Sequence, residues 1–114
     1  MNEYMLIYKG GDPDFRKDDA SMAEIMEAWG AWFAKLEQQG NLANGGSPLH
    51  FAGKRIAKDM LVTDIAASEL KELVSGYSII KAESLEQAVE ISKGCPIFDA
   101  PIMSVEVREI MKLG

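Results

Sequence analysis

Apolar and polar positions divide the chain into segments with two different periods. Residues 3–9 (EYMLIYK) are apolar at nearly every position, which is typical of a central strand covered on both faces. After a loop rich in Gly and Asp, residues 21–40 repeat apolar side chains every three or four positions, which predicts an amphipathic helix. Ser21 and Glu24 have the spacing of a capping box at its start, and Gly40 supplies a terminator.

The middle of the chain has weaker periodicity. Residues 41–64 contain short apolar runs separated by a Gly-Gly-Ser-Pro break at 45–48, a turn near Gly53 and a turn at Lys58 and Asp59. This spacing predicts an irregular β-hairpin. The Gly45-Gly46-Ser47 run lacks a following helix N-terminus, so it is interpreted as a bulge or turn rather than a phosphate-binding loop.

The last third repeats the order of the first. Residues 66–74 predict a short helix, and residues 76–82 (GYSIIKA) predict a strand. Ser84 and Gln87 form a second capping box, which opens a helix that Gly94 ends. Residues 103–108 alternate apolar and polar side chains, as in a half-buried strand.

Two βαβ-like units in tandem predict one arrangement of these elements. With right-handed crossovers they build a ferredoxin-like α+β fold, in which an antiparallel sheet carries two long helices on one face. Residues 1–114 contain no linker or low-complexity segment, so we expect a single domain. The other sheet face would be a large apolar patch, and a second copy is the simplest cover, so we predict a homodimer.

Composition excludes several classes of function. Twelve basic against eighteen acidic residues give a net charge of −6, which disfavours nucleic acid as a partner. One His and one Cys do not suffice for a multi-histidine metal site or an internal disulfide, and no cofactor motif is present, so no cofactor is expected. No apolar run is long enough to cross a membrane, and the N-terminus lacks the features of a signal peptide. We therefore expect a cytoplasmic protein with Cys95 reduced.

The single histidine concentrates the candidate chemistry. His50 can act as a general acid or base near neutral pH, and a carboxylate such as Asp64 can set its tautomer and raise its basicity. If the hairpin pairs around its turns, both residues approach the same end of the sheet. The alternative interpretation makes His50 an exposed strand residue and Asp64 the cap of the short helix.

Two further groups have both a functional and a structural interpretation. Cys95 lies near Lys93, which would favour a thiolate nucleophile, although a Cys between Gly and Pro at a helix end is typical of a small packed side chain. Trp29 shares the apolar stripe of the first helix and is predicted to be core. Trp32 lies to one side of that stripe, at the helix margin or an interface.

Several short segments together resemble the YCII-related family, also called the DGPF-domain family. They occur in the family's order and span nearly the whole chain: residues 4–8 (YMLIY), 62–64 (VTD), Glu69 with Lys71 and Glu72, residues 76–77 (GY), 82–88 (AESLEQA), 95–96 (CP) and 105–108 (VEVR).

The resemblance implies a dimeric α/β barrel, in which two ferredoxin-like sheets face each other. It also implies an enzymatic role for a His and Asp pair, as suggested for some members. The sequence departs from the family at the motif that names it, because Asp64-Ile65-Ala66-Ala67 stands in place of Asp-Gly-Pro-Phe. Asp64 is retained, whereas the tight turn and the pocket wall of the motif are not.

Two functions follow from this evidence. The first is a cofactor-independent enzyme that performs acid-base chemistry on a small polar or aromatic metabolite, with His50 as acid or base and Asp64 orienting it. The second is a non-catalytic dimer that binds a small ligand or regulates another process. In both, the partners are a second copy and a small molecule, without nucleic acid or membrane.

Overall fold

The computed structural model describes residues 1–12, 15, 18–65 and 67–114. Asp14 in the predicted loop and Ala66 at the start of the predicted short helix lie outside this part. The elements, in chain order, are β1 (Asn2–Lys9), α1 (Asp19–Gln38), β2 (Leu42–Pro48), β3 (Lys54–Ile56), β4 (Val62–Asp64), the 3-10 helix η1 (Ala67–Glu72), β5 (Val74–Ala82), α2 (Leu85–Ser92), the 3-10 helix η2 (Pro96–Asp99) and β6 (Ser104–Glu109).

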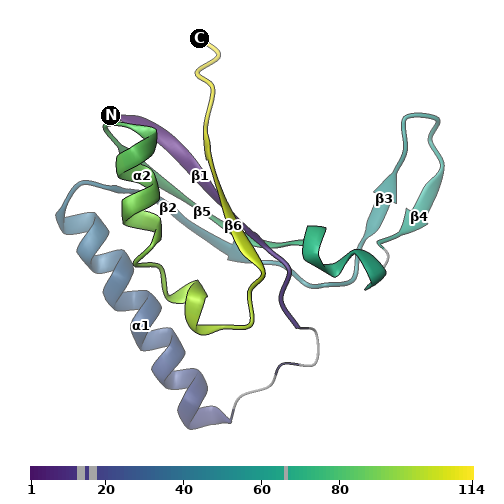
Figure 1. The fold of residues 1–114 in the computed structure, drawn as a ribbon, viewed down its shortest axis with the longest axis horizontal. Coiled ribbons are helices and arrows are strands. Elements are labelled where there is room, and N and C mark those ends of the chain that lie inside the picture. The colour runs from purple at the N-terminus through teal and green to yellow at the C-terminus, as the bar shows by residue number, and fades with distance from the viewer. Residues whose placement is uncertain (13–14, 16–17, 66) are drawn as a thin grey trace.

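The main sheet has the strand order β2-β5-β1-β6, and every neighbouring pair is antiparallel. This is the ferredoxin-like order, with α1 and α2 on the same side of the sheet (Figure 1), so the predicted fold is confirmed. β1 lies between two strands, as its apolar sequence predicts. A single chain forms an open sheet, and the closed barrel of the prediction requires a second copy.

One helix boundary, the start of α1, differs from the prediction. α1 begins earlier, because Asp18 rather than Ser21 is the cap and its side chain accepts a hydrogen bond from the Ser21 N–H at 2.7 Å. The second capping box is confirmed, since the Gln87 N–H donates to Ser84 Oγ at 3.1 Å. α2 has eight residues and lies within the range that the sequence predicts, between its Ser84 cap and Gly94.

The core lies between the sheet and the helices. Alternate residues of β1 and β5 point into it, including Leu6 and Ile80, and Leu36 of α1 closes it from the helix side. Trp32 is also buried, whereas Trp29 is only half-buried, so the predicted ranking of the two tryptophans was wrong. The strand alternation places four further apolar side chains of β1 and β5 on the opposite face, which no α-helix of the described residues covers: Met5, Ile7, Tyr77 and Ile79.

β2 continues through the Gly-Gly-Ser-Pro segment that was expected to interrupt it. The register shifts between Asn44 and Ser47, and Gly46 has a φ of 75°, so the segment is a bulge within a strand. The predicted hairpin is formed by β3 and β4, which pair with each other and with no strand of the main sheet. We call residues 54–64 the arm. No helix in the described part of the chain has the length and apolar character needed to span a bilayer.

Candidate functional site

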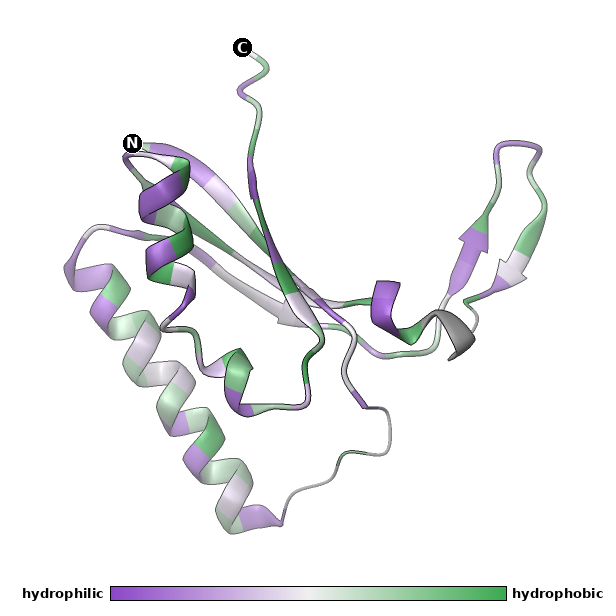
Figure 2. Cartoon of the chain, viewed as in Figure 1, coloured by the Kyte–Doolittle hydropathy of each residue, from purple (hydrophilic) through white to green (hydrophobic). Residues whose placement is uncertain are grey.

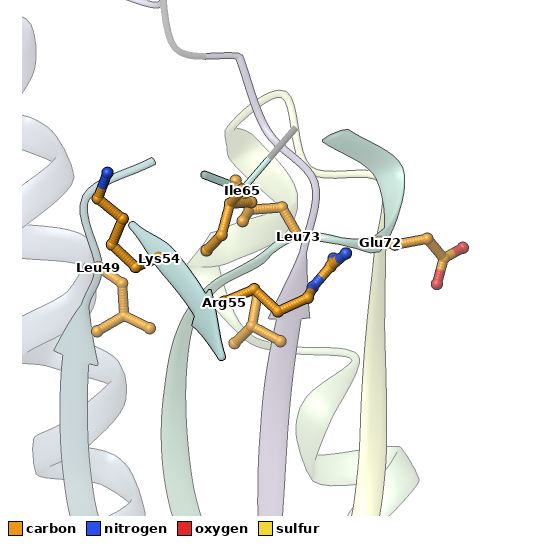
Figure 3. Close-up of a pocket in the computed structure, with 7 residues that line it drawn as sticks. Leu49, Lys54, Arg55, Ile65, Glu72 and Leu73 are labelled. Atoms are coloured by element: carbon orange, nitrogen blue, oxygen red, sulfur yellow. The ribbon is translucent and has the colours of Figure 1, made fainter. Parts of the chain in front are cut away.

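A cavity of about 390 Å³ lies where the arm joins the sheet (Figure 3). Its walls come from four regions of the chain that are distant in sequence: the end of β2, the first strand of the arm, the residue after β4, and the segment from η1 into β5. The lining residues are Leu49, Lys54, Arg55, Ile65, Glu72, Leu73 and Val74. Four of these side chains are apolar and three are charged, a combination suited to a small molecule with an apolar body and a polar group.

Two of the charged residues that line this cavity, Lys54 and Glu72, form ion pairs. Lys54 and Asp64 face each other across the arm, and the Lys54 ammonium donates to the Asp64 carboxylate. On the sheet side, Lys9 Nζ lies 3.2 Å from Glu72 Oε2 and 3.1 Å from Glu106 Oε2. The hydrogen bond to Glu106, followed by that to Glu72, raises the pKa of Lys9, so this lysine remains a cation.

The two predicted site residues flank the cavity in sequence without facing each other. His50 follows the lining residue Leu49 and is exposed, and Asp64 precedes the lining residue Ile65. Among the described residues, no hydrogen bond or ion pair joins His50 to Asp64. The Asp64 carboxylate binds Lys54 instead. Lys54 lines the cavity, so Asp64 is connected to the cavity only by this ion pair.

The Cys95 thiol lies in the core between the sheet and the helices. It is 4% exposed and lies 3.5 Å from the Tyr8 hydroxyl, which donates to Ser78 Oγ at 2.7 Å. Burial raises the pKa of Cys95, and it likewise raises the pKa of Tyr8 above its ordinary value. A buried, protonated thiol fits the packed interpretation of Cys95 rather than the nucleophilic one.

Sequence reasoning missed Lys54, Arg55 and Glu72 as lining residues. The partner of Lys54 was predictable only to within one position: a hairpin that turns at Lys58 and Asp59 places Lys54 opposite Thr63, whereas the longer loop of the structure pairs it with Asp64. The position of Glu72 at the cavity could not be predicted from local spacing, because it depends on the packing of η1 against β1. Among the described residues, no three His, Cys, Asp or Glu side chains gather as metal ligands do.

The sequence matches the YCII-related domain over residues 3–113. The chain belongs to the YCII-related family. No curated protein matches it significantly. Among solved structures, this YCII-related chain is similar to 5-chloro-2-hydroxyhydroquinone dehydrochlorinase (TftG) from Burkholderia phenoliruptrix AC1100, in complex with 2,5-dihydroxybenzoquinone. The two share 18% identity with a TM-score of 0.46, over 98% of this chain and 95% of that chain.

Proposed function

We propose that this YCII-related protein is a homodimeric, cofactor-independent enzyme that binds a small polar or aromatic metabolite in the cavity at the base of the arm. The observation that carries the proposal is the composition of that cavity, an apolar surface bordered by Lys54, Arg55 and Glu72, with His50 next to it in sequence. An apolar body fits against the leucine and valine side chains, and the charged groups orient its polar substituents.

His50 supplies the proton transfer in this proposal. An exposed imidazole exchanges protons with solvent and can remove a proton from a bound ligand and return it elsewhere, as isomerisation, elimination or hydrolysis requires. Asp64 is a positioning residue. The Asp64 carboxylate binds the Lys54 ammonium at the cavity wall. To orient His50, the carboxylate would have to leave this ion pair and accept a hydrogen bond from the imidazole.

Replacing His50 by Gln tests the catalytic role. We expect proton exchange on a bound ligand to slow on the order of 10²-fold, because Gln can hydrogen-bond but cannot exchange a proton. The probes are small phenols and 2-oxo acids in D₂O, with loss of ligand C–H signals followed by proton NMR. Binding is checked separately from chemical shifts of Leu73 and Val74, which the substitution leaves in place.

The alternative function is a non-catalytic dimer that binds a small ligand. The exposure of His50 and the absence of a hydrogen bond between His50 and Asp64 are the observations that support this second candidate. Ligand-induced chemical-shift changes at Leu73 and Val74, with no proton exchange on the ligand in the wild-type protein, would support the non-catalytic function. Equal exchange rates in the wild type and the His50→Gln variant would remove His50 from the mechanism.

Charge distribution supports the dimer. Among the described residues, 10–12, 15, 18–41 and 83–103, which contain both α-helices, hold two basic and ten acidic residues, a net charge of −8. The remaining segments, which contain the strands, η1, the arm and the C-terminal segment, hold eight basic and seven acidic residues, a net charge of +1. Two copies therefore repel each other least when they approach through their sheets. The uncovered apolar side chains of β1 and β5 lie on that same face.

Light scattering at micromolar concentration is expected to give twice the 12.5 kDa chain mass. Replacing Ile7 by Asp should convert the protein to a monomer, because it would bury a carboxylate without a partner in the interface. Met26→Asp, on the exposed side of α1, is the matched control and should stay dimeric. A wild-type protein of single-chain mass would contradict the dimer, and circular dichroism verifies that both variants are folded.

A further inference from the structure

The arm projects from the body of the protein. The radius of gyration is 15.6 Å, against roughly 13 Å for a compact chain of this length. Figure 1 shows the arm and the C-terminal segment on the side of the sheet away from α1, near opposite ends of the strands. An isolated two-stranded hairpin is marginally stable in water, so an arm of this length needs a surface to pack against.

The end of the arm is apolar. Its four large apolar residues are between 55% and 75% exposed, and we call them the arm tip: Ile56, Met60, Leu61 and Val62. Ile56 and Val62 are opposite each other in the register, so they share a face. Figure 2 shows hydrophobic residues on both sides of this turn. Exposed apolar side chains gathered at the end of a projection are typical of a contact surface.

Met60 occupies a position in the turn that favours glycine or asparagine. Its N–H donates to the Ala57 carbonyl at 2.8 Å, and its φ of 71° is in the left-handed region. A methionine there is strained, and its side chain makes up the most exposed part of the tip. The turn gains no stability from the Met60 side chain, which is therefore available for contact with another molecule.

A matching surface lies at the other end of the uncovered sheet face. A cavity of about 640 Å³ is lined there by Met1, Glu3, Lys81, Ile110, Met111 and Lys112, and we call it the tail cavity. Glu3 and Lys81 are paired in register and alternate with the buried residues of β1 and β5, so they lie on the uncovered face. Three apolar side chains and three charged ones line it, which complements an apolar tip whose turn contains Lys58 and Asp59.

The sheet face alone is smaller than a standard dimer interface. Four strands spaced about 4.8 Å apart and eight residues long at about 3.3 Å each give a face of roughly 500 Å². A standard interface buries roughly 800 Å² per partner. Two further contacts, one at each end of the sheet, would supply the missing area.

We propose that the arm tip of one protomer docks into the tail cavity of a second copy, and that the second copy does the same in return. A two-fold axis between the sheets and perpendicular to the strands places the two ends over each other, so every contact occurs twice. This inference rests on the proposed face-to-face dimer. It adds the orientation of the two copies and assigns the arm, which contributes Lys54 and Arg55 to the cavity, to the interface.

A disulfide between protomers tests the contact. Chains carrying only Met60→Cys are mixed with chains carrying only Met111→Cys and oxidised under mild conditions. We expect a cross-linked pair in the mixture, at least tenfold above its yield in either variant alone. Mixing Met60→Cys with Met26→Cys, whose thiol lies on α1, is the control and should give only background. The buried Cys95 is present in every sample and does not distinguish them.

The outcomes separate the two proposals. A wild-type dimer with no cross-link above the control would overturn the docking of the arm and leave the dimer standing. A monomer in light scattering would overturn both.

A second variant, Met60→Gly, keeps the test independent of oxidation. It relieves the left-handed strain and removes the side chain, so we expect a folded protein whose dimer dissociation constant is about tenfold higher or more. An unchanged dissociation constant would contradict a role of the arm tip in the interface.

Discussion

Replacing Gly46 by alanine is expected to lower the free energy of unfolding by about 3 kcal/mol or more. Gly46 lies in the bulge of β2, where its φ is 75° and an added Cβ would lie 1.7 Å from the Tyr77 carbonyl oxygen. The obstacle is backbone of the neighbouring strand, so it cannot move aside as a side chain would. The preceding carbonyl, that of Gly45, accepts the Ser78 hydroxyl at 2.8 Å, which ties the bulge to the buried Tyr8.

Gly30 provides the matched control for this substitution. It lies in the interior of α1, is exposed, and has nothing within 4 Å of an added Cβ. Gly30→Ala is therefore expected to raise the free energy of unfolding by about 1 kcal/mol, through better helix propensity. Urea denaturation of the three proteins at one concentration measures both changes. Equal stability of the Gly46→Ala variant and the wild type would mean that β2 does not have this bulge in solution.

The Cys95 thiol is expected to react with a thiol reagent at least about 10³-fold more slowly in the folded protein than in urea. Burial excludes the reagent, and it also raises the pKa of the thiol, so that less thiolate is present at a given pH. Reaction then requires the core around Tyr8 to open. The rate, followed by absorbance with an aromatic disulfide reagent, reports the free energy of that opening.

The same reagent distinguishes a packed thiol from a reactive one. The Met26→Cys variant adds an exposed thiol on α1 and is expected to show one fast and one slow reaction in the same molecule. The Gly46→Ala variant should react faster at Cys95 than the wild type, because it opens more often. Fast reaction of wild-type Cys95 under native conditions would restore the nucleophile interpretation.

Local signals sufficed for most of the fold. The apolar run of β1, the helical period of α1 and the Ser84 cap of α2 each depend on side chains within a few residues, so the sequence alone identified these elements. Errors arose where several local signals compete. Asp18 and Ser21 can both cap a helix, and only the folded chain shows that Asp18 accepts the bond. The glycines of β2 look like an interruption because a bulge has the composition of a turn.

The candidate site was predicted less well than the fold. His50 was selected because the chain has one histidine, and Asp64 because it remains from a family motif, and neither argument contains a distance. The structure places Asp64 against Lys54 across the arm and surrounds the nearby cavity with residues from η1 and β5. The cavity residues of different segments are far apart in the sequence, so no local spacing predicts that they lie together.

The sequence by itself determined the order of the elements, the α+β class and the single candidate acid-base residue, because periodicity, capping and composition are properties of neighbouring residues. Only the tertiary structure decided that Trp32 is more buried than Trp29, that Lys9 bridges Glu72 and Glu106, and that the arm projects with an apolar tip. These features depend on the distances between segments, which packing of the whole chain sets.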